Sequence, residues 1–405
     1  MNVLVVNAGS STLKYQVIDT KSHKVSAKGS CERVCFTGGT FTHAANGSKK
    51  VTENIEFPDH KVAIEVVLKD LEANGVKIEG IGHRIVQGGW YFGDSSLVDE
   101  DVLAKIREVA PLAPLHNNPE ANVIEYCLEQ YPDLPNVTVY DTAFHFNMPE
   151  VAKTYALPKD VCDKLHIRKY GAHGTSYRYI SKKVAEMTNG EARKVVVCHI
   201  GSGASLCAIE DGKCMDTTMG LTPLDGVMMG TRCGSIDPAT VCYLQREGGY
   251  SYQEVDDMMN KRSGLLAISG ISNDARDIRT RASEGDERCL LAFDMFAYKA
   301  MQQAGSMIAS MAGVDTITFT AGIGENDFNT KLKNGQKFLQ GGDRLKVTIR
   351  FRGREMAHTN IGEQLLRDFA AKCADIANLD KQPKLEGRNM SMFLSPKPQN
   401  TNSKK

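Results

Sequence analysis

The chain has 405 residues, and its 49 Lys and Arg balance 49 Asp and Glu, so the formal net charge is zero. With 41% hydrophobic and 24% charged residues, it has the composition of a globular protein rather than a disordered or fibrous one. The length predicts two or three domains. A balanced charge provides no overall field for nucleic acid or a membrane surface, so we expect neither as a partner.

The composition also bears on the compartment. Met1 leads directly into the strand-like run Val3–Val6, without the basic and long apolar segments of a secretory signal. The longest apolar runs fall far short of the roughly 20 residues of a membrane helix. Eleven cysteines, none in a CxxC pair, are typical of free thiols in a reducing compartment. We therefore expect a cytoplasmic protein. Cys198, Cys207 and Cys214 lie close together, but without the spacings typical of zinc sites.

Strands and helices are predicted to alternate along the chain. The pattern predicts two strands joined by a Gly-Ser turn, followed by alternating helices and strands, which favours an α/β fold. In chain order the predicted elements are the hairpin 5–19, helix 59–73, strand 78–86, helix 122–130, strand 136–140, hairpin 197–211, helices 251–259 and 290–311, and strand 316–320.

The two predicted hairpins resemble each other. Residues 5–19 and 197–211 each consist of an apolar strand, a Gly-Ser turn and a second apolar strand that ends at an acidic turn, at a shift of 192 residues. Such a repeat predicts two similar α/β domains. We place the boundary between Met148 and Pro149, with domains at 1–148 and 149–334.

The Gly-Ser turns are candidate phosphate sites. Consecutive backbone N–H groups in a tight turn can form a concave anion site, and small residues allow the anion to approach. Near the first turn, Asn7, Ser10 and Thr12 add side-chain donors, and Lys14 adds a cation. A plain hairpin turn is the alternative, but two related turns favour a nucleotide held between the domains.

A third glycine cluster, Gly322–Asn326, follows the strand 316–320. Its GxG pattern is similar to a dinucleotide fingerprint, but Asp327 stands where the third glycine belongs. A turn that contacts adenosine or ribose fits better. The chain also lacks the GxxxxGK[ST] motif of P-loop enzymes.

Several further segments are rich in groups that can bind or transfer a phosphoryl group, a reaction that requires cations, hydrogen-bond donors and alignment. Taken singly, an Arg at a strand end is usually a surface ion pair, a lone His is usually structural, and Asp141 could cap the following turn. The prediction therefore depends on the whole set: His83–Arg84, Leu112–Asn117, Asp141–His145, His173–Ser176 and Gly230–Pro238.

The ordered motifs resemble those of acetate kinases, nearly without gaps from residue 1 to about residue 334. They are Asn7–Lys14, Gly82–Arg84, Ala113–Asn117, Asp141–His145, His173–Ser176, Asp216–Gly220, Gly230–Pro238 and Gly322–Asn326. The resemblance implies two duplicated ribonuclease-H-like domains of the actin-like ATPase superfamily, with ATP in an interdomain cleft. It also implies a homodimer that transfers phosphoryl reversibly between ATP and acetate, giving ADP and acetyl phosphate, with Mg²⁺.

The resemblance assigns roles by position. Arg84 is similar to the acetate-carboxylate ligand, and Asp141, His173 and Arg232 match the catalytic residues. Because acetate is already ionised near neutrality, we expect Asp141 to orient Arg84 or Mg²⁺ rather than to remove a proton. The other implied substrate contacts are Val86, Leu115, His116 and Pro223, and the implied metal contact is Asn7. The implied nucleotide contacts are Ser10, Thr12, Lys14, His199, Ile200, Gly201, Ser202, Gly203, Asp274, Ala275, Arg276, Gly322, Ile323, Gly324, Glu325 and Asn326.

Some positions depart from the family pattern. Gln87 and Ser202 replace the usual His and Asn, and Ala172 replaces a Phe that lines the acyl pocket. A wider pocket predicts weaker selection between acetate and propionate, since one methylene is worth roughly 1–3 kcal/mol. Propionate kinase, or a broader short-chain carboxylate kinase, is therefore the alternative activity.

The larger departure is the segment 335–405, which we expect to be an atypical, partly disordered tail. Residues 331–405 carry 16 Lys and Arg against 7 Asp and Glu, and 395–405 have an unfolded composition. The family's Glu near Mg²⁺ has no counterpart there, and a shifted reading frame is one explanation. A catalytically silent nucleotide-binding homologue is the alternative of another class. A third alternative is an ATPase similar to actin or Hsp70. Such an ATPase would not need Arg84 beside an apolar acyl pocket, so this alternative is less favoured.

Overall fold

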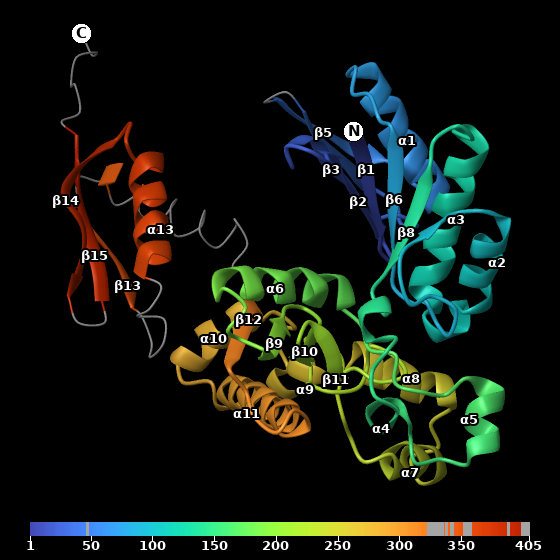
Figure 1. Cartoon of the computed structure of the whole chain (residues 1–405). Coiled ribbons are helices and arrows are strands. Elements are labelled where there is room, and N and C mark those ends of the chain that lie inside the picture. The colour runs from blue at the N-terminus through green and yellow to red at the C-terminus, as the bar shows by residue number, and fades with distance from the viewer. Residues whose placement is uncertain are drawn as a thin grey trace. The chain divides into compact units, whose positions relative to one another are not determined.

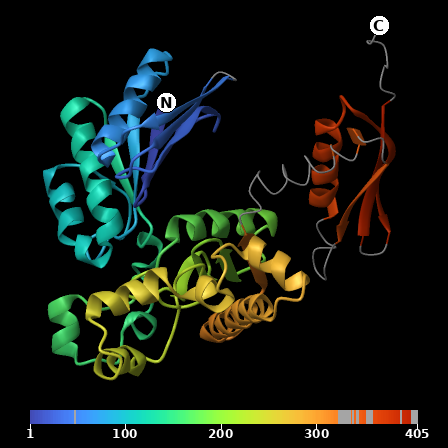
Figure 2. The same ribbon diagram turned by 180° about the vertical axis from the view of Figure 1, so that it is seen from behind.

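The computed structural model describes residues 1–45, 48–321, 336, 339–340, 344–350, 359–386 and 389–397. The chain divides into two compact units, Met1–Thr320 and Ala321–Lys405. Figures 1 and 2 show the arrangement of elements within each unit from opposite sides. None of the helices in the described ranges is long and apolar enough to cross a membrane.

The first unit begins with a mixed sheet whose strands follow the order β5-β4-β3-β2-β1-β6-β8-β7. Neighbouring strands from β5 to β1 are antiparallel, whereas β1, β6 and β8 are parallel to one another. The strands are β1 (Asn2–Ala8), β2 (Thr12–Asp19), β3 (Val25–Glu32), β4 (Gly39–Ala45), β5 (Ser48–Ile55), β6 (Gly80–Ile85), β7 (Ser96–Leu97) and β8 (Asn136–Tyr140).

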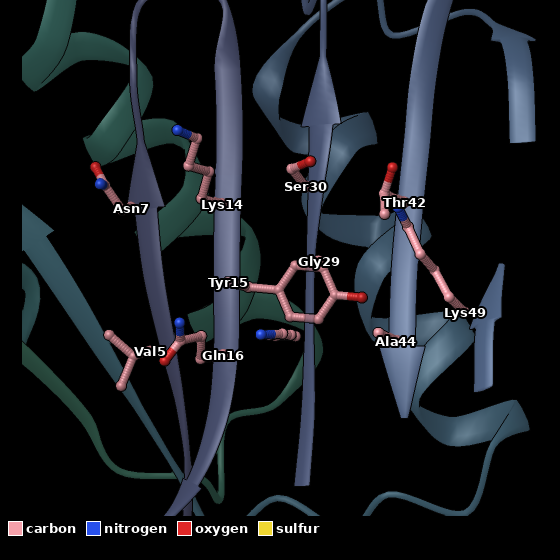
Figure 3. Close-up of a pocket in the computed structure, with 11 residues that line it drawn as sticks. Val5, Asn7, Lys14, Tyr15, Gln16, Gly29, Ser30, Thr42, Ala44 and Lys49 are labelled. Carbon is pink, nitrogen blue, oxygen red and sulfur yellow. The ribbon is translucent and has the colours of Figure 1, made fainter. Parts of the chain in front are cut away.

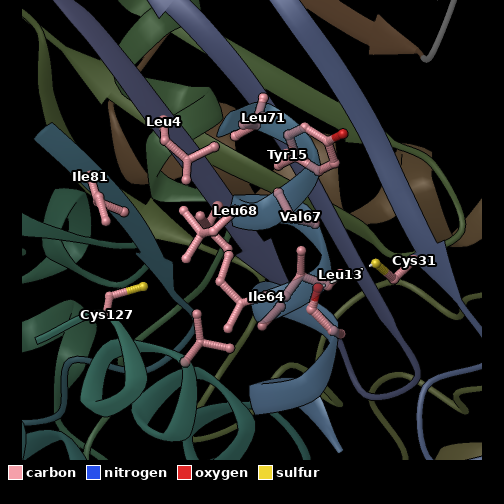
Figure 4. Packing of buried hydrophobic residues seen from close by; sticks show 14 of the residues in the cluster. Leu4, Leu13, Tyr15, Cys31, Ile64, Val67, Leu68, Leu71, Ile81 and Cys127 are labelled. Atoms are coloured by element: carbon pink, nitrogen blue, oxygen red, sulfur yellow. Dashed lines mark hydrogen bonds between the residues drawn. The ribbon is translucent and has the colours of Figure 1, made fainter. Parts of the chain in front are cut away.

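Helices α1 (His60–Ala73) and α3 (Pro114–Gln130) cover one face of this sheet. Alternation in β1 places Leu4 and Val6 in the core, while Val5 lies on the opposite face. Figure 4 shows Leu4 packed near Leu68 and Leu71 of α1. Helix α1 begins after Asp59, whose side chain accepts a hydrogen bond from the backbone N–H of Val62.

The second sheet of this unit has the order β11-β10-β9-β12. Its strands are β9 (Lys194–Ile200), β10 (Ala204–Glu210), β11 (Lys213–Thr217) and β12 (Thr316–Ala321). The hairpin β9–β10 repeats β1–β2, since β9 occupies the positions of β1 at the predicted shift of 192 residues. The predicted domain boundary after Met148 falls between the two sheets.

The remaining helices of the first unit surround these sheets. They are α2 (Glu100–Glu108), η1 (Ala110–Leu112), η2 (Ala143–His145), α4 (Glu150–Lys153), α5 (Lys159–Leu165), α6 (Gly174–Met187), α7 (Ala239–Arg246), α8 (Tyr252–Lys261), α9 (Gly264–Ser269), α10 (Ala275–Ser283) and α11 (Glu287–Ser310).

Helix α3 begins earlier than the predicted helix 122–130, at Pro114. Pro114 stands in the first turn, where a missing N–H costs nothing, and Pro119 lies inside the helix. Hydrophobic periodicity did not predict the first two turns of α3, because two prolines in a short segment are more typical of a loop than of a helix.

The second unit contains an antiparallel sheet of order β13-β15-β14 with helix α13 packed on one face. Its elements are β13 (Leu345–Arg350), α13 (Thr359–Lys372), β14 (Ala377–Glu386) and β15 (Asn389–Pro396). Leu366, Phe369, Met392 and Leu394 form its buried core. Ser395 and Pro396, which we expected in an unfolded end, therefore belong to β15, while 398–405 lie outside the described residues.

Candidate active site

Arg84 connects the ends of three neighbouring strands. It lies near the end of β6, between Asn7 of β1 and Asp141, which follows β8. Its Nη1 donates to Asn7 Oδ1 at 2.9 Å, and its Nε and Nη2 donate to Asp141 Oδ2 at 3.1 and 2.6 Å. Parallel strands place their carboxyl ends at the same edge of a sheet, where ligands commonly bind. The structure thus joins three of the predicted site residues.

The pair Arg84–Asp141 is largely shielded from solvent. The side chain of Asp141 is 5% exposed and that of Arg84 33%. Burial alone would lower the pKa of Arg84, but the charge of Asp141 and the hydrogen bonds to it raise that pKa. Arg84 is therefore a fixed cation that remains partly exposed.

Asp141 also holds the start of α6. Thr175 Oγ1 donates to Asp141 Oδ1 at 2.7 Å, and the backbone N–H of Gly174 donates to the Asp141 carbonyl at 2.8 Å. A Cβ on Gly174 would lie 2.3 Å from that carbonyl oxygen, so only glycine fits there. Asp141 therefore does more than cap the following turn, because it joins the first sheet to His173, which precedes α6.

His173 is oriented by a hydrogen bond at its Nδ1 atom. Its Nδ1 lies 2.8 Å from Ser205 Oγ, which in turn bonds the hydroxyl of Tyr177. If Tyr177 donates to Ser205 and Ser205 donates to His173, then Nε2 carries the proton. Burial and the neighbouring ring of His199, stacked at 4.2 Å, lower the pKa of His173 to about 3. His173 is thus a neutral donor at neutral pH.

Arg232 and the second Gly-Ser turn lie against His173. A Cβ on Gly203 would be 3.5 Å from His173 Nε2 and 3.8 Å from Arg232 Nη1. The same Nη1 donates to the carbonyl of Pro223 at 3.2 Å. Burial lowers the pKa of Arg232, but a guanidinium remains charged in proteins. The absence of a side chain at Gly203 leaves room beside both predicted catalytic groups.

His116 lies in the first turn of α3. Burial, and then the charges of Arg84 and Arg232, lower its pKa. Two of the residues predicted to contact the substrate differ in exposure. Val86 is buried, whereas Leu115 is 58% exposed.

The two turns are both tight. The N–H of Gly9 donates to the carbonyl of Thr12 at 2.7 Å, and the N–H of Gly201 donates to that of Gly203 at 3.1 Å. Asn7, linked to Arg84, leads into the first turn, and Gly203, beside His173, closes the second. The predicted phosphate turns are therefore connected through the Arg84–Asp141–His173 cluster.

Lys14 lines a pocket on the open face of the first sheet, with a volume of about 600 Å³. Figure 3 shows Asn7 and Lys14 side by side on β1 and β2. Lys28 and Lys49 also line this pocket, so its wall is cationic and suited to an anion. Its other lining residues are Val5, Tyr15, Gln16, Gly29, Ser30, Thr42 and Ala44.

The other predicted nucleotide residues lie at the start of α10 and in the segment after β12. Asp274 caps α10, where its carboxylate accepts the backbone N–H of Arg276 at 2.8 Å and pairs with the exposed guanidinium of that residue. Ala275 is the first residue of α10. Gly322, Ile323, Gly324, Glu325 and Asn326 lie outside the described residues.

Glu120 was missed by sequence reasoning. It is 2% exposed, accepts the backbone N–H of Val86 at 3.1 Å through Oε2, and has no hydrogen-bond partner for Oε1 within the described part of the chain. Burial raises its pKa to about 8, against the opposing charge of Arg84. Its position one helical turn after His116 was the available signal. Ser205 was missed too, since only the folded chain brings it to His173, whereas Thr175 belongs to the predicted segment His173–Ser176.

The repeated hairpins and the two sheets have the actin-like ATPase fold of duplicated ribonuclease-H-like domains, which the chain shares with solved carboxylate phosphotransferases. Residues 2–342 match the model of the Acetokinase family, and the chain belongs to that family.

Named relatives agree with this assignment. The chain is 48% identical over 335 residues to acetate kinase 2 of Clostridium perfringens, covering 80% of this chain and 84% of the relative. A solved acetate kinase from Porphyromonas gingivalis is 37% identical with a TM-score of 0.75, covering 84% of this chain and 88% of that one. A propionate kinase from Francisella tularensis is 39% identical with a TM-score of 0.77 at the same coverage.

A second family model matches the end of the chain. Residues 313–397 match "Translation initiation factor IF-3, C-terminal domain", overlapping the first match at 313–342. A translation in a shifted reading frame would not be expected to match a known domain or to form the packed core of the second unit. These two findings argue against the frame-shift explanation.

Proposed function

We propose that the region matching the Acetokinase family, residues 2–342, transfers the γ-phosphoryl group of ATP reversibly to acetate, giving acetyl phosphate and ADP. The observation that supports this most is the connection of both Gly-Ser turns through Arg84, Asp141 and His173. The relatives named acetate kinase support the same reaction.

Arg84 would bind the acetate carboxylate. A planar guanidinium can hold two carboxylate oxygens, and Asp141 and Asn7 fix its orientation from behind. Acetate is ionised at neutral pH, so its oxygen attacks without a general base. Asp141 then acts by orienting Arg84, with both of its oxygens already accepting hydrogen bonds.

His173 and Arg232 would stabilise the transferring phosphoryl group. Charge spreads over its equatorial oxygens in the transition state, and pre-oriented donors lower that barrier. Nε2 of neutral His173 and Nη1 of Arg232 both lie within 4 Å of the position that a Cβ on Gly203 would take. The other N–H groups of the two turns, beyond those of Gly9 and Gly201, and Lys14 would hold the remaining phosphates.

Mg²⁺ fits the oxygen donors of this site. Asn7 and Asp141 offer an amide and a carboxylate oxygen, the hard ligands that Mg²⁺ prefers together with substrate phosphates. When bound, the ion neutralises phosphate charge. Asn7 and Asp141 would hold it at the edge of the first sheet.

The test of this proposal is acetyl phosphate formation by the purified chain, trapped as the hydroxamate, together with calorimetric ATP binding. We expect product from the parent chain and at least a hundredfold lower kcat in Arg232→Ala, about the loss seen when one such donor is removed. ATP binding without any product would instead support the silent homologue.

Propionate is the second candidate substrate. The propionate kinase similar to this chain, and Ala172 where the family usually has Phe, both favour it. We expect kcat/KM for propionate within tenfold of that for acetate, and a larger preference for acetate in Ala172→Phe. A steep acetate preference in the parent chain would contradict this.

We further propose a cytoplasmic homodimer. The cysteines are free thiols, as in a reducing compartment. Leu291, Tyr298 and Met301 of α11 are each more than half exposed, and apolar surface of this kind is typical of subunit contacts. Light scattering of the purified chain tests the dimer.

For the second unit we propose a role in translation through RNA binding. The match to an initiation-factor domain supports it, as does a segment 331–405 with 16 basic and 7 acidic residues. On β15, Phe393 faces Lys346 and Lys381, whose ammonium groups lie 5.4 and 5.3 Å from the ring centroid. Aromatic and basic side chains on a sheet bind bases and phosphates.

This differs from the expectation of no nucleic acid. That expectation used the net charge of the whole chain, in which residues 1–330, with 33 basic and 42 acidic residues, cancel the basic end. Fluorescence anisotropy with a structured RNA tests the proposal. Binding should weaken steeply with salt and in Phe393→Ala, while acetyl phosphate formation stays unchanged.

A further inference from the structure

Three metal-ligating side chains meet in the core of the first unit, outside the residues used for phosphoryl transfer. His145 Nδ1 lies 3.0 Å from Cys214 Sγ, and Cys214 Sγ lies 3.5 Å from Cys207 Sγ. All three ligand atoms lie within 4.8 Å of one another. His145 and Cys207 are fully buried and Cys214 is 4% exposed.

The imidazole of His145 is held as in a metal site. Its Nε2 lies 2.9 Å from the carbonyl of Ala172, so Nε2 carries the proton and the Nδ1 lone pair points toward the sulfur atoms. Metal-binding histidines almost always donate their other N–H to such an acceptor. Tyr177 packs edge-on against the ring, with centroids 5.6 Å apart.

The charge of the cluster also favours a cation. Two thiolates with one divalent cation form a neutral group, which removes much of the cost of burying charge.

The donor set selects the kind of ion. Two sulfur atoms and one imidazole suit thiophilic d¹⁰ cations, whereas Mg²⁺ and Ca²⁺ require oxygen ligands. Zinc–sulfur and zinc–nitrogen distances of about 2.3 and 2.0 Å correspond to ligand separations of about 3.5–3.8 Å. The two separations from Cys214 Sγ, 3.0 Å to His145 Nδ1 and 3.5 Å to Cys207 Sγ, would therefore open by about half an ångström at most, while the third pair lies within 4.8 Å.

We propose that His145, Cys207 and Cys214 bind one thiophilic d¹⁰ cation, Zn²⁺ or Cu⁺. On binding, each cysteine that is still protonated loses its thiol proton to solvent and forms a sulfur–metal bond, and His145 adds its Nδ1 lone pair without a change of protonation. Because His145 holds the carbonyl of Ala172, the ion would fix the backbone directly before His173.

The experiment uses the full chain with Cys35→Ser and Cys242→Ser, which remove the two exposed thiols. The reduced, metal-stripped protein is titrated with Zn²⁺ or, under nitrogen, with Cu⁺. Binding is followed by native mass spectrometry and by ultraviolet thiolate-to-metal absorption. We expect one ion per chain and a higher Tm, with the tighter-binding ion identifying the natural class.

Three variants make the result specific. Cys207→Ala/Cys214→Ala should bind no ion, and Cys207→Ala alone should bind at least about tenfold more weakly while keeping the His145–Cys214 hydrogen bond. Cys198→Ala, a buried thiol outside the cluster, should bind like the parent. Equal binding by the parent and Cys207→Ala would overturn the proposal.

X-ray absorption spectroscopy of the metal-loaded parent chain identifies the atoms that bind the ion. It tests the proposed site even if the variants fold poorly. A first shell of two sulfur atoms and one nitrogen supports the site. Failure of the parent to bind an ion, or a shell of oxygen and nitrogen alone, overturns it. None of these readouts depends on kinase activity, so the proposed function is tested separately.

Discussion

At the scale of single residues, Arg84 shows how neighbours define a role. Asp141 accepts from Nε and Nη2 and Asn7 accepts from Nη1, so that each terminal nitrogen keeps one further N–H for a ligand carboxylate. The same contacts explain why Asp141 is poorly suited to take a proton: its two oxygens already accept hydrogen bonds from Arg84 and Thr175. Orientation, rather than proton transfer, follows from this geometry.

His173 should be neutral in the ligand-free protein. Its pKa of about 3 predicts that its imidazole resonances do not titrate between pH 5 and 8 by NMR. We expect His173→Ala to lower kcat by about 10²–10³-fold through loss of one phosphoryl donor. His166→Ala, whose ring stacks on Trp90 instead, is the control and should keep kcat. Titration of His173 near pH 6.5 would contradict this view.

Glu120 should make stability depend on pH. Because its pKa is raised from 4.5 to about 8, the native carboxyl keeps a proton that the unfolded chain loses. The stabilisation is present below pH 4.5 and is lost as the pH rises to 8. Relative to parent, Glu120→Gln should therefore gain about 1–3 kcal/mol in free energy of unfolding between pH 5 and 8.5.

Urea unfolding at several pH values measures this gain. Glu129→Gln, an exposed carboxylate on the same helix, is the control and should change stability by less than about 0.5 kcal/mol at any pH. Parallel curves for parent and Glu120→Gln would show that Glu120 is ionised in the folded chain.

At the scale of elements, the hairpins β1–β2 and β9–β10 contain the two Gly-Ser turns of the proposed phosphate site. Apolar alternation and the Gly-Ser turns are local signals, and β1–β2 and β9–β10 follow them closely. The register of each hairpin is set by its own turn, so a sequence pattern can predict it. Gly203 belongs to the second turn but works through its neighbours, His173 and Arg232.

Gly203→Ala should weaken ATP binding without unfolding the chain. The new Cβ would make ordinary contacts of 3.5 and 3.8 Å with His173 and Arg232, but it would occupy space beside both phosphoryl donors. We expect KM for ATP to rise about tenfold, equivalent to about 1.4 kcal/mol. Gly305→Ala, where nothing lies within 4 Å of the added Cβ, should leave KM unchanged. Equal KM values in both variants would place the phosphates elsewhere.

At the scale of the whole molecule, two units with separate cores and opposite charges share one chain. The curated relatives extend beyond the matched region, since the chain covers 84% of acetate kinase 2 of Clostridium perfringens. At this end the chain is instead similar to an initiation-factor domain. Each unit can therefore be perturbed through its own core.

Calorimetry should resolve two unfolding transitions, because separate cores unfold as separate cooperative units. Leu366→Ala in the second unit should cost about 2–5 kcal/mol and lower only one transition. Ile64→Ala in the first unit should lower only the other. A single transition that both variants shift would show that the units unfold together.

Local patterns were sufficient for the α/β class, the duplicated hairpins, and the residue types of a phosphate site, because turns and strand alternation depend on near neighbours. They failed at α3, where two prolines hid the helix start, and in the segment after 334, where no familiar motif was found. The net charge of zero was also a poor basis for the prediction about nucleic acid, because an acidic segment 1–330 and a basic segment 331–405 cancel in it.

Contacts between distant residues required the folded chain. Arg84 and Asp141 lie 57 positions apart, and His145 and Cys214 lie 69 apart. The packing of strands and helices decides which side chain neutralises, orients or buries another. The spacing of residues along the chain does not predict these contacts. The burial of Glu120 and the neutral state of His173 arise for the same reason, since desolvation exists only once the core has formed.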